Sequence, residues 1–171
     1  DTVFSQSSYT INANVERLFL LDGGNYNANG RNGQNDFLAG NTGNNIINGF
    51  SGNDTIRGGL GNDTLTGGTG LDIFQFLTTP DTAANRDIIT DFNAANDTIQ
   101  LDNAVYTLLA ATGVLAANLF RNITIGAQDA DDRILYDQTN GNLYYDNNGL
   151  AAGGVAHFAE VTNGLALTNA D

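Results

Sequence analysis

A large apolar residue recurs at every ninth position between residues 38 and 74. The series is Leu38, Ile47, Ile56, Leu65 and Phe74, and the segments between its members are rich in Gly, Asn and Asp. A glycine-rich flexible linker would show no such recurrence, because a linker has no core to fill. The pattern instead predicts short strands that each place one side chain in a shared core and are joined by tight turns.

The turns repeat in register with the apolar series. Three consecutive nine-residue units have Asp at the sixth place and an apolar residue at the eighth: GFSGNDTIR at 49–57, GGLGNDTLT at 58–66 and GGTGLDIFQ at 67–75. The register extends backwards through 40–48, where Asn45 stands in the Asp place, and through 31–39, which keeps Asp36. Residues 22–30 no longer follow it. Degenerate units at the start of an array are typical of a terminal cap.

These units resemble GGxGxDxUx, the calcium-binding nonapeptide of RTX proteins. The resemblance implies an all-β fold, a right-handed parallel β-roll with an N-terminal β cap and a mostly antiparallel C-terminal β cap that contains a short helix. Each unit would be a six-residue turn followed by a three-residue strand. Two units, or eighteen residues, would form one coil of the roll, with one strand in each of two parallel sheets. Glycines at the first, second and fourth places are expected to allow positive φ.

The same resemblance implies calcium sites between stacked loops. Loops that stack lie eighteen residues apart, so the expected pairs are Asp36 with Asp54, Asn45 with Asp63, and Asp54 with Asp72. Calcium takes six to eight oxygen ligands, and both carboxylates and carbonyls are suitable. In RTX proteins the earlier loop contributes carbonyls from its first and third places, and the later loop from its second and fourth. The implied ligands in the array are Arg31, Gly33, Asp36, Gly40, Thr42, Asn45, Gly49, Phe50, Ser51, Gly52, Asp54, Gly58, Gly59, Leu60, Gly61, Asp63, Gly68, Gly70 and Asp72.

The predicted sites differ in strength. Asp54 has a partner loop on each side and is expected to serve two sites, whereas Asp36 and Asp72 are each expected to touch one. The site with Asn45 should be the weakest, because a neutral amide replaces one carboxylate.

A closing site is expected where the array ends. Asp81 lies eighteen residues after Asp63, within PDTAANRDIITDF, an acidic segment similar to those that close the roll in RTX proteins. Asp63, Asp81 and Asp87 would form this site. Asp81 equally suits a simple turn after Pro80, and the sequence leaves both interpretations open.

The flanking segments divide the chain into three expected regions: capping strands at 1–21, the calcium-binding roll at 22–76, and a C-terminal capping and secretion region at 77–171. The first region contains β-formers and indicates two short strands. In the last region we expect one or two short helices within 103–120, a hairpin at 133–146 with an Asn140-Gly141 turn, and a strand at 157–162. Two of its segments, 86–102 and 127–149, are similar to segments that follow the array in secreted RTX proteins.

Composition narrows the classes of partner. The net charge of −13 argues against nucleic acid or an anionic membrane. Cys is absent, which excludes disulfides, so a metal is the expected means of stabilising an extracellular protein of this kind. No stretch approaches the length of a transmembrane helix, and we expect no membrane span. The predicted core is one residue thick, so calcium has to supply stability that burial alone does not.

Catalytic chemistry is not expected. The only His is His157, in the alternating segment VAHFAEV, where a strand residue is favoured over a general base. Neither HExxH nor GxSxG occurs, so we expect no enzyme activity. The alternative function is binding of an anionic polysaccharide, or a place at the end of an adhesin. A surface groove with clustered Arg and Tyr would favour it, although Arg residues are scattered among acids along the sequence.

The resemblance therefore implies the C-terminal module of a larger secreted bacterial protein, exported by type I secretion machinery. The sequence begins DTVFSQ, which resembles the interior of a longer chain, and we expect an effector domain upstream. Free calcium is scarce in the cytosol and abundant outside the cell. Such a module would stay unfolded for export, then bind calcium, fold outside the cell and support folding of the effector domain.

Overall fold

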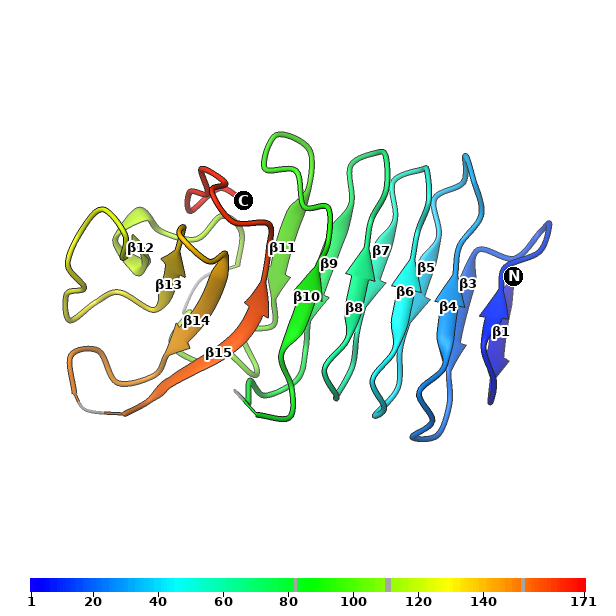
Figure 1. Cartoon of the computed structure of the whole chain (residues 1–171), viewed down its shortest axis with the longest axis horizontal. Helices are drawn as coiled ribbons and strands as arrows, with labels where there is room; N and C mark the ends of the chain where they lie inside the picture. The colour runs from blue at the N-terminus through cyan, green and yellow to red at the C-terminus, as the bar shows by residue number, and fades with distance from the viewer. Residues whose placement is uncertain (82, 110–111, 152) are drawn as a thin grey trace.

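The computed structural model describes residues 1–81, 83–109, 112–151 and 153–171, and it is almost entirely β-structure. Most strands stack as successive coils along one axis (Figure 1). The strands are β1 (Thr2–Ser5), β2 (Tyr9–Thr10), β3 (Arg17–Leu20), β4 (Asn27–Asn29), β5 (Phe37–Ala39), β6 (Ile46–Asn48), β7 (Thr55–Arg57), β8 (Thr64–Thr66), β9 (Ile73–Phe76), β10 (Asp87–Ile89), β11 (Thr98–Leu101), β12 (Phe120–Asn122), β13 (Ile134–Asp137), β14 (Asn142–Asp146) and β15 (Val155–Glu160).

The strands form two sheets. Sheet A has the order β1-β3-β5-β7-β9-β11, and sheet B has the order β12-β13-β14-β15-β10-β8-β6-β4-β2. Odd-numbered strands up to β11 lie in sheet A and even-numbered strands up to β10 lie in sheet B, so each coil contributes one strand to each sheet. This is the expected parallel β-roll.

The nonapeptide units form β5 to β9, with one unit for each strand. Phe37 pairs with Thr55, and Thr55 pairs with Ile73, which is the expected eighteen-residue step. The apolar column between the sheets is at most 1% exposed and comprises Leu38, Ile47, Ile56, Leu65 and Phe74. The nine-residue period therefore predicted the core of the roll correctly.

The N-terminal segment is part of the roll. Three strands, not two, lie within residues 1–21, and β1, β2 and β3 all pair in parallel with the coil that follows. Leu18 pairs with Leu38, and Ala28 pairs with Ile47, so these coils are longer than eighteen residues. The expected number of two short strands in this segment is therefore wrong. Ala28 is fully buried and fills the core column where the nonapeptide pattern has ended.

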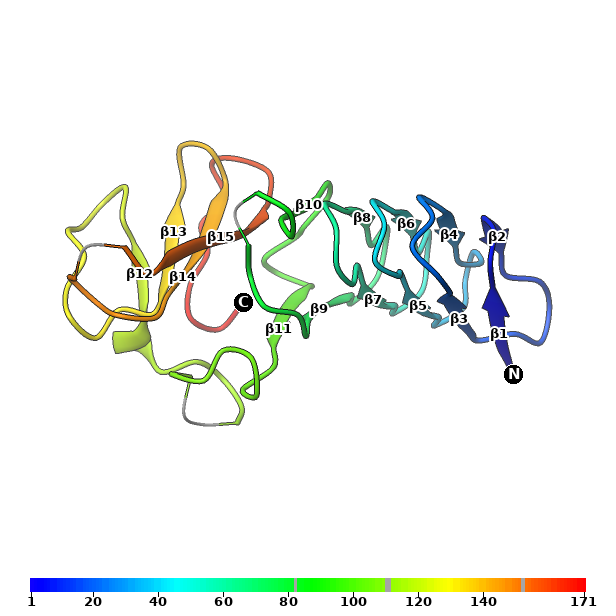
Figure 2. The same ribbon diagram turned by 90° about the horizontal axis from the view of Figure 1, so that it is seen from below.

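Beyond the array, β10 and β11 extend both sheets with longer loops. Ile89 pairs with Leu65, and Ile99 pairs with Phe74. Sheet B then continues through β15, β14 and β13, which pair antiparallel with one another and form the end of the molecule opposite the N-terminus (Figure 2). The hairpin expected at 133–146 is confirmed, and Gly141 has a φ of 82° at its turn. The strand expected at 157–162 lies at 155–160.

The short helix expected within 103–120 is confirmed among the described residues as a single 3-10 turn. The described parts of this segment contain hydrogen-bonded turns and one 3-10 turn at Ala117–Leu119. The apolar side chains of this segment pack into the core where the roll meets the C-terminal strands. Tyr106 is 1% exposed and packs edge-on against Tyr145 and Phe158, which fastens the segment to β14 and β15. Among the described residues, no helix has the length and apolar character needed to cross a membrane.

Candidate calcium sites

Two columns of turn residues run along the roll, each at the start of the strands of one sheet. Column A, next to sheet A, consists of Asp36, Asp54, Asp72 and Asp97, and column B, next to sheet B, consists of Asn45, Asp63 and Asp87. All seven side chains are at most 7% exposed. Carboxylates are seldom buried to this extent unless they are paired or coordinate a metal.

One hydrogen bond repeats between successive members of a column. The backbone N–H of each member donates to Oδ1 of the carboxylate one coil further along. The distances are 2.7 Å from Asp36 N to Asp54 Oδ1, 2.7 Å from Asn45 N to Asp63 Oδ1, and 2.8 Å from Asp54 N to Asp72 Oδ1. The three residue pairs expected from the eighteen-residue spacing are therefore adjacent in the structure.

Both columns continue past the nonapeptide array. Asp63 N donates to Asp87 Oδ1 and Asp72 N donates to Asp97 Oδ1, both at 3.0 Å. Asp97 was missed by the sequence analysis. Its signal was local: Asp97 precedes the inward-facing Ile99 by two residues, as Asp72 precedes Phe74. Asp72 consequently has a neighbouring loop on each side, whereas the eighteen-residue spacing gave it a partner loop on one side only.

Asp81 lies outside column B, contrary to the eighteen-residue rule. Its side chain is exposed, and its Oδ1 accepts hydrogen bonds from the backbone N–H groups of Ala83 and Ala84. It therefore makes the turn that was the alternative interpretation. The coil from Asp63 is longer than a repeat coil, so Asp87 takes the place that the spacing assigned to Asp81.

The buried carboxylates lack partners that the protein could supply. The buried oxygens without a hydrogen-bond partner include Oδ1 of Asp36 and Oδ2 of Asp54, Asp63 and Asp72. Burial raises the pKa of Asp54 to about 7. Burial also raises the pKa values of Asp63 and Asp87, and the negative charge of Asp63 raises that of Asp87 further. An unpartnered ionised carboxylate in this environment destabilises the fold unless a cation is bound.

The first-place glycines leave open the space into which these oxygens point. A Cβ on Gly49 would lie 2.3 Å from Asp54 Oδ2 and 2.6 Å from the carbonyl oxygen of Gly67. A Cβ on Gly58 would lie 2.3 Å from Asp63 Oδ2 and 2.8 Å from Asp87 Oδ2. Carboxylate and carbonyl oxygens thus converge where any side chain would intrude.

Glycines at the second and fourth places have a different role. Positive φ occurs at these places, in Gly52, Gly59, Gly61, Gly68 and Gly70, whereas the first-place glycines of the same units lie outside that region. The expectation of positive φ at the first place is therefore wrong. The turns also stack closely, since a Cβ on Gly68 would lie 1.7 Å from the carbonyl oxygen of Phe50. Phe50 itself occupies a second place with a φ of 72°, a conformation that L side chains rarely adopt.

The other expected ligands lie in the same stacked turns. The carbonyl oxygen of Ser51 accepts a hydrogen bond from Gly33 N at 2.7 Å. The backbone N–H of Arg31 donates to Asp36 Oδ2 at 2.6 Å, which holds that carboxylate in its turn. In the 40–48 turn, a Cβ on Gly40 would lie 2.0 Å from the carbonyl oxygen of Gly58, while Oγ1 of Thr42 lies 3.0 Å from the Cβ position of Gly23. Leu60 donates its backbone N–H to the carbonyl oxygen of Asn41 at 3.0 Å.

These observations fit calcium. The converging atoms are hard oxygen donors from carboxylates and carbonyls, which calcium prefers. Within the described ranges, no group of three or more His, Cys, Asp or Glu side chains is arranged to hold a metal. A site built from two carboxylates of adjacent coils and several backbone carbonyls needs no such group. When bound, calcium would neutralise the paired carboxylates and join one loop to the next.

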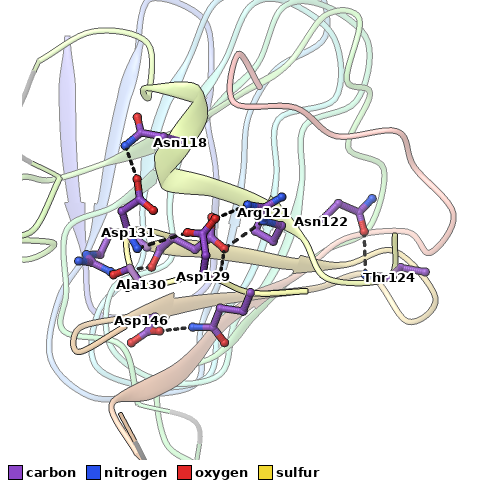
Figure 3. A network of polar contacts seen from close by, with 11 residues as sticks. Asn118, Arg121, Asn122, Thr124, Asp129, Ala130, Asp131 and Asp146 are labelled. Carbon is purple, nitrogen blue, oxygen red and sulfur yellow. Dashed lines mark hydrogen bonds and ion pairs between the residues drawn. The ribbon is translucent and has the colours of Figure 1, made fainter. Parts of the chain in front are cut away.

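A second acidic cluster, in the C-terminal end of the molecule, contains a cationic partner, and Oδ1 of its buried Asp132 has no hydrogen-bond partner (Figure 3). The guanidinium of Arg121 pairs with Asp129 at 2.6 Å and with Asp132 at 3.0 Å. Asp146 Oδ1 accepts from the backbone N–H groups of Asn148 and Gly149, and its Oδ2 accepts from Gln128. The positive charge of Arg121 in this cluster sets it apart from the two columns, where carboxylates face carbonyls.

His157 is a structural strand residue. It lies in β15, is 5% exposed, and its Nε2 is 2.9 Å from the carbonyl oxygen of Ala159. Its ring packs on Tyr144 with centroids 4.8 Å apart, and burial lowers its pKa. This is the strand residue that the sequence favoured.

Comparison with known families agrees with the geometry. The family described as RTX calcium-binding nonapeptide repeat matches in four copies, over residues 32–65 and 48–75. The matched residues include five of the seven members of columns A and B, namely Asp36, Asn45, Asp54, Asp63 and Asp72. A comparison with curated protein sequences found no match. The chain thus contains RTX nonapeptide repeats, and these repeats bind calcium.

Proposed function

We propose that the chain is a calcium-dependent folding module, without catalytic activity of its own, that supports type I secretion of an effector domain upstream in the same chain. The observation that carries the proposal is the set of buried, unpartnered carboxylate oxygens in Asp36, Asp54, Asp63 and Asp72. Without a cation these oxygens oppose folding, and with calcium they favour it. Folding is thereby coupled to the calcium concentration, which is low inside the cell and high outside.

The calcium ions are assigned to the gaps between successive column members. The pairs are Asp36–Asp54, Asp54–Asp72 and Asp72–Asp97 in column A, and Asn45–Asp63 and Asp63–Asp87 in column B. The remaining ligands would be carbonyl oxygens of the glycine-rich turns. The closing pair Asp63–Asp87 has strong support, because both Oδ2 atoms lie within 2.8 Å of one Cβ position on Gly58.

The first test of this function is the dependence of folding on the cation. In chelator the chain should be largely disordered, and calcium should restore β-structure in circular dichroism. Magnesium should not, since it demands a smaller, near-octahedral site and loses water reluctantly. A folded spectrum in chelator, or equal effects of the two cations, would contradict the proposal.

The second test concerns export. We propose that residues 77–171 carry the information for export and that the roll at 22–76, which follows the first coils at 1–21, supplies calcium-coupled folding free energy. A passenger fused upstream should then leave the cell only when residues 77–171, with any natural residues that follow them, are attached. Deleting 31–76 should permit export but yield a poorly folded passenger. Secretion of active passenger without 77–171 would refute the assignment.

A second candidate function, binding of an anionic polysaccharide, is favoured by the outer face of sheet A. Arg17 lies 5.0 Å from the ring centroid of Phe37, and Arg57 lies 5.3 Å from the same centroid. The ring of Phe19 is tilted against that of Phe37, with centroids 5.2 Å apart, and Arg57 donates to Gln75. The fold thus gathers two of the six Arg residues beside aromatic rings, with Phe in place of the expected Tyr.

This face makes a separable prediction. The calcium-loaded chain should bind a uronate polymer more tightly than a neutral glucan, and Arg57→Gln with Arg17→Gln should weaken that binding. Arg133→Gln, in the C-terminal region, is the matched control. The polysaccharide function is wrong if the unmodified chain, the chain with both substitutions and the control variant bind equally, or if none of them distinguishes the two polymers. Neither result would affect the secretion function.

A further inference from the structure

One member of column B has no carboxylate. Asn45 is 1% exposed, and both ends of its amide are satisfied by protein atoms. Nδ2 donates to the carbonyl oxygens of Tyr26 at 3.0 Å and Gly24 at 3.3 Å, both in the preceding coil. Oδ1 accepts from the backbone N–H of Asn41 at 2.9 Å, within its own turn.

The backbone fixes which end of the amide faces which coil. The N–H of Asn41 needs an acceptor, so Oδ1 must lie on that side, and the two carbonyls of the preceding coil need a donor. Asn41 places a second amide between the same two coils, because its Nδ2 donates to the carbonyl oxygens of Leu21 and Gly24 at 3.0 Å each. Three carbonyl oxygens at this step therefore receive hydrogen bonds from two Asn side chains.

The corresponding atom of an aspartate column member faces a different environment. Oδ1 of Asp54 accepts an N–H from the preceding coil, whereas Asn45 at the same place meets carbonyls. Calcium bonds to oxygen and gains nothing from an amide nitrogen. An N–H donor directed at carbonyls offers them a partial positive charge where a cation would offer a full one.

We infer that Asn41 and Asn45 take the place of a calcium ion between the coil at 21–26 and the array. Asn45 is suited to this boundary because its amide is a donor on one side and an acceptor on the other. Its Oδ1 faces the array, where it and the carbonyl oxygen of Gly58 lie 2.5 Å and 2.0 Å from the Cβ position of Gly40. The coils without calcium thus end at Asn45. The calcium-binding gaps of column B begin with the gap between Asn45 and Asp63.

The inference rests on the calcium assignment above and is independent of the secretion role. Asn45→Asp would place a carboxylate oxygen against the carbonyls of Gly24 and Tyr26, an arrangement that needs a cation. At saturating calcium, this variant should bind one more calcium per full-length chain than the unmodified protein, as counted by isothermal titration calorimetry and elemental analysis. If the step already held a weakly bound calcium, the variant would bind more tightly with an unchanged count, and the inference would be overturned.

Asn44→Asp is the matched control for charge, since Asn44 is exposed and its Oδ1 would still accept from Asn62 N in the Asp form. Its calcium count should be unchanged. Asn41→Ala keeps the inference testable if Asn45→Asp fails to fold. It should lower the thermal midpoint in calcium without changing the calcium count, whereas loss of a calcium would refute the inference. Absence of calcium binding by the unmodified chain would instead refute the proposed function.

Discussion

Replacing Asp54 by Asn should change stability in opposite directions with and without calcium. The side chain is 1% exposed, and Oδ1 accepts a hydrogen bond from Asp36 N at 2.7 Å that the amide oxygen of Asn can also accept. The substitution therefore keeps the shape and this contact. It removes the negative charge and puts an N–H donor at the position of Oδ2, which has no partner and lies near the carbonyl oxygen of Gly67.

The magnitude follows from the pKa of the buried carboxyl. Burial raises the pKa of Asp54 from 3.8 to about 7. Each pKa unit corresponds to about 1.4 kcal/mol, so ionising this group in the metal-free fold at pH 8 costs about 4 kcal/mol. Whole domains are stable by only about 5–15 kcal/mol, so a few such groups are enough to keep the metal-free chain unfolded. Asp54→Asn should stabilise the metal-free fold by up to this amount.

With calcium the sign reverses. Asp54 lies between two loops and is assigned to two sites, so its loss should weaken calcium binding about tenfold or more, which is about 1.4 kcal/mol for each site. The assay is circular dichroism at pH 8, in chelator and through a calcium titration, with urea unfolding of the folded forms. The variant should retain more β-structure in chelator and require more calcium to fold completely.

Asp81→Asn is the matched control, because Asp81 is exposed and Asn can make the same turn contacts to Ala83 and Ala84. It should change neither measurement. The reasoning would be refuted if Asp54→Asn lost structure in chelator as well as in calcium, since the buried charge would then not oppose the metal-free fold.

Four further predictions follow from the same geometry. The metal-free fold binds a proton at Asp54 more tightly than the unfolded chain, so in chelator β-structure should increase as pH falls from about 7 to about 4, while calcium affinity decreases over the same range. Phe50→Gly should raise the thermal midpoint in calcium by removing about 1 kcal/mol of strain at a φ of 72°; an unchanged or lower midpoint would contradict this. Ile56→Ala should destabilise the calcium-bound roll by about 2–5 kcal/mol in urea unfolding, because Ile56 is fully buried between the sheets. Asp87→Ala should remove one bound calcium and Asp81→Ala none, as counted by calorimetry. Equal losses would show that Asp81 belongs to the closing site, as the eighteen-residue spacing predicts.

Coil length decides which stacked residues can be predicted from the sequence. Between residues 36 and 75 the coil is eighteen residues long, and the spacing identified both the stacked pairs and the buried column. Beyond the array the coils lengthen. The same arithmetic added Asp81 to the closing site, beside Asp63 and Asp87, and omitted Asp97. Loop length is weakly constrained by local sequence, because an inserted surface loop costs little free energy. The better guide was the motif next to the strand, an Asp two residues before an inward-facing apolar residue.

Local chemistry thus determined the repeat, the core column and the oxygen-rich turns, since each depends on residue types at short, regular spacing. Tertiary structure decided which turns are neighbours once that spacing changes. It also decided the two roles of glycine, because only stacking shows that Gly49 keeps space for carboxylate oxygens while Gly68 needs a positive φ. The role of Asn45 is of the same kind. Whether an amide weakens a metal site or replaces the metal depends on whether the opposite coil presents N–H groups or carbonyls, and that is settled by the path of the backbone in space.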